Sequence, residues 1–343
     1  MKTLISYGYG AAVALRNLAF DRGWARMASV AVPVISVGNI TAGGAGKTPV
    51  VEYLAALLLA RGRRVAVVTR GYRRATRGSV VVSDGRGRVV SARDGGDEPV
   101  QIARKFPSLV VIADARRRRG CARAVAEFGA ECILLDDAFQ HRAMRRDLDI
   151  VVIDAAEGVA GQHLLPRGRL REPLTNLRRA DLILLSKCDD AVAVERLRRA
   201  LGAWTPAPVF ATRFVARGWR RLGREGEMPV EALAGIPIGS FCGIGRPTGF
   251  RTTLHALGLA PVIERPFADH HPYTTRDITA LAEDGRRAGV RAWVTTEKDA
   301  MRLMDTDDWR ALGDVSYPRM EVVFSGDEEE FVACVLERCG VVR

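Results

Sequence analysis

One glycine-rich segment carries the strongest structural signal in this sequence: Val37-Gly-Asn-Ile-Thr-Ala-Gly-Gly-Ala-Gly-Lys-Thr48. An apolar run leads into it, and a helical pattern follows over residues 49–60. A glycine-rich loop between a buried strand and a helix is the context in which a P-loop binds nucleotide phosphates. The segment therefore predicts a P-loop, with a glycine-rich turn before an ordinary helix as the alternative.

The residues of this loop have separate expected roles. Its glycines let backbone N–H groups turn inward around phosphate oxygens, because no Cβ blocks the approach. Lys47 is expected to bridge the outer phosphates, and the Thr48 hydroxyl to ligate Mg²⁺. The strict pattern has glycine where this chain has Thr41. The predicted nucleotide-binding residues are Thr41, Ala42, Gly43, Gly44, Ala45, Gly46, Lys47 and Thr48.

A magnesium site also needs an acid at the end of a neighbouring strand. The apolar run that begins at Cys132 ends in Asp136 and Asp137. One carboxylate can hold the ion or its water while the other faces the phosphates. The sequence therefore predicts that Thr48, Asp136 and Asp137 bind Mg²⁺, with helix capping by one acid as the alternative.

Short β-branched runs alternate with helical stretches from Val30 onward. Strands interleaved with helices predict α/β layers with mostly parallel sheets. A first series of expected strands comprises residues 34–37, 65–69, 80–83, 109–113, 132–136, 150–154 and 182–186. A second series comprises residues 209–215, 238–242, 262–266, 292–295 and 321–324.

A proline-marked break, Ala203-Trp-Thr-Pro-Ala-Pro208, separates the two series. We therefore expect two α/β/α domains with a ligand-binding cleft between them. The P-loop domain would comprise residues 29–205. A smaller α/β domain, residues 206–343, would close over the cleft.

The first 28 residues predict an amphipathic helix, residues 1–28. Apolar residues such as Leu4 and Leu15 follow helical spacing, while Lys2 and nearby arginines supply positive charge. The longest uncharged run there, residues 3–15, is shorter than the roughly 20 residues of a membrane-spanning helix. The pattern alone leaves two interpretations open: a helix lying in a membrane interface, or one packed on the protein's own core.

The composition is that of an ordered α/β protein with excess positive charge. Hydrophobic residues make up 48% of the chain, charged residues 27%, and the net charge is +12. Clustered arginines account for the charge, and they fit either solvated helix faces or a partner that carries phosphate. Aromatic residues make up only 6%, which argues against base-stacking platforms for nucleic acid. Six cysteines without a CxxC pair indicate buried thiols in a reducing, cytoplasmic compartment.

A set of short motifs runs in a fixed order through most of residues 30–300. Besides the P-loop it comprises Thr69-Arg-Gly-Tyr72, Gly96-Asp-Glu-Pro99, Asp136-Asp-Ala-Phe-Gln-His141, Leu165-Pro-Arg-Gly-Arg-Leu-Arg-Glu-Pro173, Phe241-Cys-Gly-Ile-Gly-Arg-Pro247, Phe267-Ala-Asp-His270 and Thr296-Glu-Lys-Asp299. The ordered set resembles the tetraacyldisaccharide 4′-kinases, the lipid A 4′-kinases of Gram-negative bacteria. No single motif is as specific as the set.

The resemblance implies an ATP-dependent, P-loop NTPase-like kinase of lipid A biosynthesis. The γ-phosphoryl group of ATP would pass to the 4′-hydroxyl of tetraacyldisaccharide 1-phosphate, a glycolipid, with Mg²⁺ as cofactor. It also implies a peripheral protein on the cytoplasmic face of the inner membrane, whose N-terminal helix contacts the anionic membrane surface. Because threonine is common at the first P-loop position in this family, Thr41 is no defect. No nucleic-acid partner and no obligate protein partner are expected.

Phosphoryl transfer to an alcohol needs a group that orients the hydroxyl and accepts its proton. Asp97 follows two glycines and precedes Pro99, so it suits this role or, alternatively, caps the next helix. The resemblance implies that Asp97 is the catalytic base and that His270, from the second domain, pairs with it. His271 is the adjacent alternative to His270. Lys47 completes the expected catalytic set.

Five further side chains are expected around the ligands. Gln140 and His141 follow the metal acids, and we assign Gln140 to the nucleotide and His141 to the substrate. Arg171 and Glu172 lie on a loop rich in proline, glycine and arginine that resembles an active-site edge. Arg70 is expected to reach the substrate phosphate or lipid headgroups.

Two rival functions rest on other features. Leu185-Ser-Lys-Cys-Asp189 resembles the Asn-Lys-x-Asp element with which GTPases read guanine, but Ser186 replaces the asparagine. The alternative is therefore a P-loop GTPase or metallochaperone-type regulator. The high charge would suit a nucleic-acid-stimulated ATPase, but the sequence has no recognisable nucleic-acid-binding motif.

Overall fold

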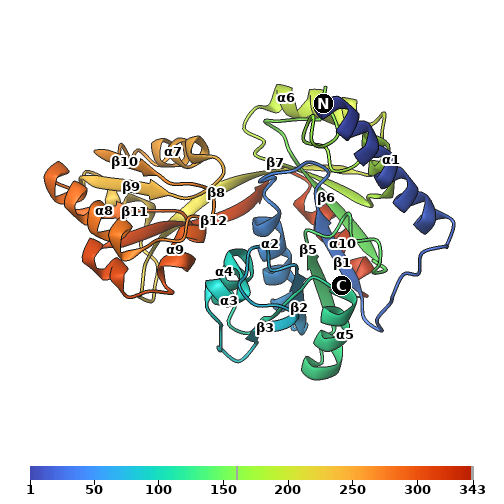
Figure 1. The fold of residues 1–343 in the computed structure, drawn as a ribbon, viewed down its shortest axis with the longest axis horizontal. Coiled ribbons are helices and arrows are strands. Elements are labelled where there is room, and N and C mark those ends of the chain that lie inside the picture. Colours follow the sequence, from blue (N-terminus) through green and yellow to red (C-terminus); the bar gives the residue numbers. More distant parts are fainter. Residues whose placement is uncertain (160, 341–343) are drawn as a thin grey trace.

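Apolar runs of the N-terminal half form a mostly parallel sheet (Figure 1). The computed structural model describes residues 1–159 and 161–340. The strands of this half are β1 (Val34–Gly38), β2 (Val65–Thr69), β3 (Ser79–Asp84), β4 (Val110–Asp114), β5 (Cys132–Asp136), β6 (Leu148–Asp154), β7 (Leu182–Ser186) and β8 (Val209–Arg221). Their order in the sheet is β3-β4-β2-β5-β1-β6-β7-β8, and all these neighbours are parallel except β3 and β4.

Helices cover both faces of this sheet, which explains why its central strands are largely apolar. The helices of this lobe are α2 (Lys47–Leu59), α3 (Ala92–Gly95), α4 (Asp97–Lys105), α5 (Arg117–Phe128) and α6 (Ala191–Leu201). On one face, Ile35 and Val37 of β1 share a buried cluster with Leu54 of α2. On the other face, Val34 shares a cluster with Cys121 of α5. The prediction of a P-loop NTPase-like α/β fold is confirmed.

The C-terminal half builds a smaller lobe of the same kind. Its elements are β9 (Ile238–Cys242), α7 (Pro247–Ala256), β10 (Ile263–Pro266), α8 (Thr275–Ala288), β11 (Ala292–Val294), α9 (Glu297–Leu303) and β12 (Val315–Phe324). The strand order is β10-β9-β11-β12, and these neighbours are parallel. Short 3-10 helices occur at Leu174–Arg179, Val230–Leu233 and Asp308–Leu312.

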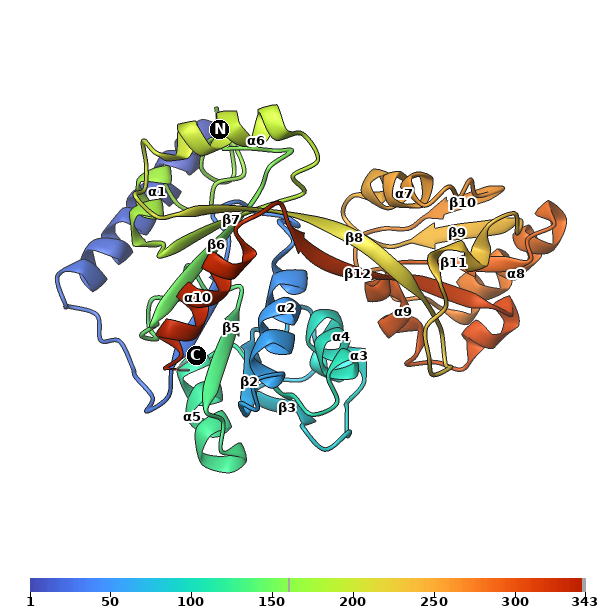
Figure 2. The same ribbon diagram turned by 180° about the vertical axis from the view of Figure 1, so that it is seen from behind.

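A long antiparallel ribbon of β8 and β12 joins the two lobes, as Figure 2 shows from behind. Its pairing runs from Thr212 opposite Phe324 to Arg221 opposite Ser316. At its other end, β8 pairs with β7, so all twelve strands form one hydrogen-bonded sheet. Both ribbon strands extend beyond the predicted ranges 209–215 and 321–324. Arginines interrupt their apolar pattern, which an antiparallel ribbon with a solvated face tolerates.

The C-terminal helix α10 (Glu328–Arg338) returns to the N-terminal lobe. Phe331 packs against Tyr53 and Phe210, with ring centroids 6.2 and 5.4 Å away. The thiols of Cys132 and Cys339 lie 3.8 Å apart. The expected second domain, residues 206–343, therefore differs from the observed lobe, because the chain crosses the ribbon twice.

Helix α1 (Lys2–Asp21) lies along the N-terminal lobe and is attached by polar contacts. The Ser6 hydroxyl donates to the carbonyl of Leu164 (2.9 Å), and the Tyr9 hydroxyl to that of Arg171 (2.8 Å). Its outward side is apolar, with Leu4 77% and Leu15 65% exposed. Among the described residues, no helix has the length and apolar character needed to cross a membrane.

Candidate active site

The P-loop connects the carboxyl end of β1 to the first turn of α2. Gly43 and Gly46 have φ angles of 118° and 83°, in the left-handed region that favours glycine. A Cβ atom at Gly46 would lie 2.4 Å from the ring of Phe214. The N-terminus of α2 begins directly at the loop, so its N–H groups and dipole favour an anion there.

Residues at the end of β7 and just after it support the P-loop by donating hydrogen bonds to its backbone carbonyls. Ser186 Oγ donates to the carbonyl of Ala45 (2.8 Å), and Lys187 Nζ to that of Gly44 (3.1 Å). Both belong to the segment that resembles a guanine-reading element. Their side chains are directed at the loop itself, while Asp189 is exposed.

Lys47 lies between the P-loop and the predicted metal acids. Its Nζ is 3.4 Å from Asp137 Oδ1 and donates to Asn39 Oδ1 (3.2 Å). Arg171 Nη1 donates to the same Asp137 oxygen (2.8 Å). Burial would raise the pKa of Asp137, but Lys47 and Arg171 hold that pKa below its ordinary value. The ionised carboxylate therefore lies beside the lysine expected to bind phosphate.

Asp136 presents a buried carboxylate oxygen without a partner. Thr69 Oγ1 donates to its Oδ2 (3.2 Å), whereas Oδ1 has no hydrogen-bond partner among the described residues. Burial, together with the charges of Glu98 and Asp137, raises the pKa of Asp136 to about 6. An orphaned carboxylate oxygen is what a hard cation such as Mg²⁺ would complete.

These residues fit Mg²⁺ better than a transition metal. The described part of the chain holds no cluster of three or more His, Cys, Asp or Glu side chains arranged for a metal. Mg²⁺ needs no such cage, since it keeps waters and uses one or two carboxylates together with phosphate oxygens. Thr48, at the start of α2, and the two acids after β5 supply protein oxygens of this type.

Asp97 is contacted by two side chains from the other lobe. It is the first residue of α4, and its Oδ2 lies 2.9 Å from His270 Nδ1 and 2.7 Å from Arg302 Nε. Burial would raise the pKa of Asp97, but the hydrogen bond from His270 and the charge of Arg302 lower it overall. Asp97 is therefore an ionised, oriented carboxylate at neutral pH.

Of the two adjacent histidines, the structure brings His270 to Asp97. His270 has a φ angle of 59°, which is uncommon for a residue with a side chain and is often found at functional sites. The ring of His271 is stacked on Phe267, and its Nε2 lies 3.0 Å from Asp277 Oδ2. His271 is thus held against α8, away from Asp97.

Sequence reasoning missed Arg302, which lies one helical turn after the motif that ends at Asp299. Only 8% of its side chain is exposed, and its Nη1 donates to Asp299 Oδ1 (2.6 Å) and to the carbonyl of Gly243 (3.1 Å). Asp299 also accepts from the Tyr273 hydroxyl (2.9 Å). The guanidinium is therefore fixed in the C-terminal lobe and presented to Asp97.

A second contact between the lobes lies beside this carboxylate–histidine pair. Lys298 of α9 donates to Glu98 of α4, the residue after Asp97. Although burial opposes ionisation, Lys298 holds the pKa of Glu98 below its ordinary value. The charges of Glu98 and Asp136 also influence one another, so the first turn of α4 lies near the metal acids. The nucleotide side and the Asp97 side thus belong to one continuous site.

Gln140 and His141 follow β5 at the back of the P-loop. Gln140 Nε2 donates to the carbonyl of Asn39 (2.9 Å), so this side chain supports the loop backbone. Burial, with the charges of Arg117 and Arg146, lowers the pKa of His141 to about 4. His141 is therefore neutral at pH 7.

Glu172 is buried where α1 packs on the N-terminal lobe. Its side chain is fully buried and is bonded to Arg16 (2.6 Å), Asn17 (3.3 Å), Asn176 (2.8 Å) and Arg179. Glu172 therefore anchors α1 to the lobe, and its expected contact with the substrate stays a prediction.

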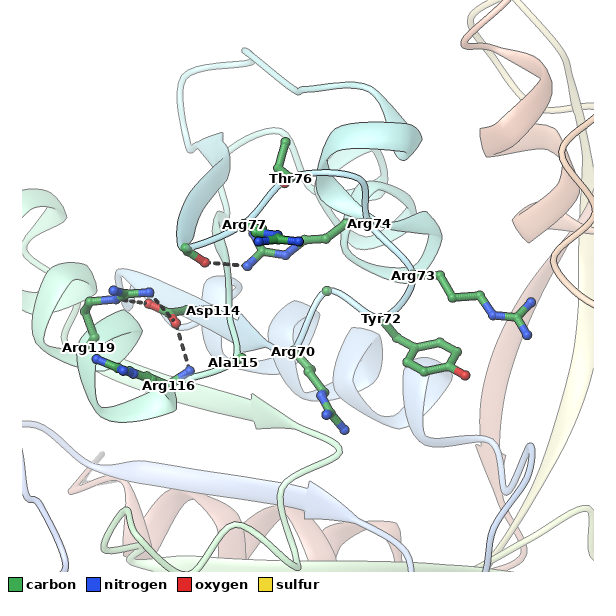
Figure 3. Close-up of a pocket in the computed structure, with 12 residues that line it drawn as sticks. Arg70, Tyr72, Arg73, Arg74, Thr76, Arg77, Asp114, Ala115, Arg116 and Arg119 are labelled. Carbon is green, nitrogen blue, oxygen red and sulfur yellow. Dashed lines mark hydrogen bonds and ion pairs between the residues drawn. The ribbon is translucent and has the colours of Figure 1, made fainter.

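Arg70 lies at the exposed end of β2, on the rim of a cavity of about 610 Å³ (Figure 3). The cavity is lined by the loop after β2 and by the start of α5. Tyr72 of the same loop places its ring edge-on to His270, with centroids 5.8 Å apart. This cavity therefore adjoins the Asp97–His270 pair.

Comparisons with known proteins agree on one family. A family model described as tetraacyldisaccharide-1-P 4′-kinase matches residues 2–340. The "Tetraacyldisaccharide 4′-kinase" of Anaeromyxobacter dehalogenans (strain 2CP-1) is 45% identical over 303 residues, 86% of this chain and 78% of that protein. That of Chlorobium phaeovibrioides is 39% identical, covering 94% and 92%. The crystal structure of "apo" form LpxK from Aquifex aeolicus in complex with ATP has a TM-score of 0.80 at 31% identity, covering 98% of each chain.

Proposed function

The chain belongs to the tetraacyldisaccharide-1-P 4′-kinase family, and on this basis we propose how its two lobes perform the transfer. It is an ATP-dependent kinase that transfers the γ-phosphoryl group to the 4′-hydroxyl of tetraacyldisaccharide 1-phosphate in lipid A biosynthesis. ATP is the donor and Mg²⁺ the metal cofactor. The observation that carries the proposal is the proximity of a P-loop, two metal acids and a cross-lobe carboxylate–histidine pair.

The nucleotide is held by the N-terminal lobe. The backbone N–H groups of residues 41–48 surround the phosphates, and Lys47 neutralises the outer ones. Thr48, Asp136 and Asp137 would hold Mg²⁺, which would offset the negative charge that develops on the phosphates. The unpartnered Oδ1 of Asp136 supports this assignment.

Asp97 receives the 4′-hydroxyl of the acceptor. Its ionised carboxylate, whose Oδ2 is held by His270 and Arg302, accepts the hydrogen bond of that hydroxyl and takes its proton. At the same time the hydroxyl oxygen bonds to the γ-phosphorus, and the bond from that phosphorus to the departing ADP oxygen breaks. His270 and Arg302 fix the carboxylate from the C-terminal lobe, which the distances of 2.9 and 2.7 Å support. Because the partners come from two lobes, an oriented base exists only when the lobes are together.

Arg171 and His141 are assigned to the acceptor side of the cleft. Arg171 donates to Asp137 (2.8 Å) and is one-quarter exposed, with 26% of its side chain accessible. Its planar guanidinium suits phosphate oxygens. The neutral ring of His141 suits hydrogen bonding to a sugar without adding charge.

We further propose that helix α1 holds the active site against a membrane surface. Its outer side and the segment after it expose large apolar side chains, namely Met1, Leu4, Ile5, Tyr7, Leu15, Leu18 and Trp24. An apolar side next to basic residues favours insertion into the interface of an anionic membrane. We assign this surface to the cytoplasmic face of the inner membrane, where the acylated acceptor would be presented.

The function is tested with γ-labelled ATP, Mg²⁺ and tetraacyldisaccharide 1-phosphate in detergent. The expected result is labelled lipid that appears only when all three are present. A parallel Asp97→Ala protein should bind ATP normally and transfer little label. Replacing ATP by GTP separates the rival, because a GTPase would hydrolyse GTP without any lipid acceptor.

A further inference from the structure

Six arginines line the cavity beside the Asp97–His270 pair, four of them gathered around it and Arg70 and Arg73 directed away from these four (Figure 3). This arginine pocket is lined by Arg70, Arg73, Arg74, Arg77, Arg116 and Arg119. The first four come from the loop after β2 and the last two from the start of α5. Its volume of about 610 Å³ exceeds that needed for one inorganic ion and suits a phosphate attached to a sugar.

Most of this positive charge is not neutralised by the protein. Asp114 is the only carboxylate in the lining, and Arg119 binds both its oxygens (2.6 and 3.0 Å). In the described part of the chain, the other five arginines have no carboxylate within ion-pair distance. Such a concentration of unpaired guanidinium groups favours a multiply charged anion.

Arg74 adds an observation that points to a ligand. Its Nη2 donates to the carbonyl of Gly78, but its buried Nη1 has no hydrogen-bond partner among the described residues. Burial, reinforced by the charge of Arg119, lowers the pKa of Arg74 despite the opposing influence of Asp114. An anion in the pocket would supply both the missing acceptor and the missing charge.

The start of α5 also favours an anion in the arginine pocket. The helix spans Arg117–Phe128, Arg116 is its N-cap, and its first turn contains no acidic residue. Its positive dipole end is therefore directed toward the pocket rim without an internal carboxylate to offset it.

The pocket touches the catalytic pair through its own lining. Tyr72 lines the pocket and contacts His270, while Arg73 Nη1 donates to the carbonyl of Asp269 (2.9 Å). The backbone of Gly96, the residue before Asp97, lies against Tyr72, since a Cβ there would be 3.3 Å from the Tyr72 carbonyl oxygen. The pocket therefore lies directly beside the Asp97–His270 pair.

We propose that the arginine pocket binds the phosphate that the acceptor already carries on its 1-position. This inference rests on the proposed function and names the part of the site that recognises its substrate. The acceptor has a phosphate at one end and the reacting hydroxyl on the other sugar. Anchoring the phosphate in the pocket directs the free hydroxyl to Asp97 and excludes the reverse orientation.

The test compares two acceptors with one double variant, Arg77→Gln together with Arg116→Gln. Both side chains are exposed and lack carboxylate partners, so the fold should tolerate their replacement. In neutral detergent, the variant should raise the KM for the 1-phosphorylated acceptor about tenfold. For the same disaccharide without its 1-phosphate, the variant and the unmodified protein should have the same KM. The KM for ATP should not change.

The matched control is Arg86→Gln together with Arg88→Gln, which removes the same charge from an exposed loop of the same lobe. This control should behave as the unmodified protein with both acceptors. An equal loss for both acceptors in the pocket variant would overturn the proposal. The proposal would also be overturned if the pocket variant sedimented less with phosphatidylglycerol vesicles while the ratio of its KM values for the two acceptors stayed unchanged. The pocket would then bind membrane headgroups. Failure of the unmodified protein to phosphorylate either acceptor would instead refute the proposed function.

Discussion

The P-loop and the Asp97–His270 pair differ in how the chain builds them. The P-loop lies within twelve consecutive residues and is formed by one strand, one turn and one helix. The Asp97–His270 contact joins residues 173 positions apart in sequence, and Arg302 is 205 positions from Asp97. One site is local, whereas the other exists only because the β8–β12 ribbon brings two lobes together.

The two sites serve two functions that a kinase must combine, binding the nucleotide and orienting the acceptor. A local site can bind nucleotide whatever the position of the second lobe. A site shared between lobes orients the acceptor only when the lobes meet, so transfer depends on both ligands being in place. Changes at the P-loop should therefore affect both ATP binding and transfer, whereas changes at the Asp97–His270 pair should affect transfer alone.

Lys47→Ala tests the local site and should have the largest effect. Without the ammonium group beside Asp137, charge on the transferred phosphoryl group loses its nearest cation. We expect transfer to fall by at least about a thousandfold, with weaker ATP binding. Steady-state transfer and calorimetric ATP titration measure the two effects. Unchanged transfer would mean that Lys47 does not bind the phosphates.

Asp97→Asn tests the shared site with a side chain of nearly the same shape. The amide keeps the packing but cannot take a proton, so kcat should fall by a few hundredfold. ATP affinity should stay within about twofold, because the nucleotide contacts are local. A variant that lost ATP binding to the same extent as transfer would remove the distinction between the sites.

Arg302→Gln should have a smaller effect and a diagnostic pH dependence. Arg302 lowers the pKa of Asp97, so its removal raises that pKa. We expect kcat to fall by roughly tenfold and the acidic limb of the kcat/KM profile to move to higher pH. Arg302→Lys should restore part of the shift. A lower rate with an unmoved acidic limb would assign Arg302 a purely structural role.

Glu297→Gln examines a contact between the lobes that is remote from the transferred group. Burial, together with the charge of Glu52, raises the pKa of Glu297 from 4.5 to about 8. The unfolded chain ionises this carboxyl first, so the folded state loses stability as pH rises from about 4.5 to about 8.

The neutral glutamine can still accept the hydrogen bond of Gln101 Nε2 (3.1 Å). We therefore expect the Tm to rise by roughly 2 °C at pH 8, with a smaller rise at pH 6. The exposed Glu283→Gln on α8 is the control and should change the Tm at neither pH. An equal effect of Glu297→Gln at both pH values would contradict the raised pKa.

The positions of the strands were predictable because most strands contain a short apolar run. All twelve expected runs coincide with observed strands, since buried parallel strands need continuous apolar residues. The full length of β8 and β12 was not predictable, because Arg213, Arg217 and Gly218 interrupt the pattern within the ribbon. The return of α10 to the first lobe was equally hidden, since periodicity shows that a helix is amphipathic but not what it packs against.

In the candidate site, too, local motifs were predictable from the sequence, whereas contacts between distant residues were not. The glycine loop and the acids after β5 are local motifs, and the structure places Lys47 3.4 Å from Asp137. Lys298 lies within the Thr296–Asp299 motif and Arg302 just after it, but nothing in the sequence indicated that they contact α4 of the other lobe. The burial of Glu172 under α1 was not predictable, because it depends on a contact with Arg16, 156 positions earlier in the sequence.

The most direct test of the account is a double-mutant cycle on kcat between Asp97→Asn and His270→Ala, with ATP affinity measured in parallel. If the two residues act as one unit across the lobes, the double variant should be no slower than Asp97→Asn alone. ATP affinity should be unchanged in all three proteins. Losses that multiply in the double variant would show that the two residues act independently and would contradict a catalytic base assembled from both lobes.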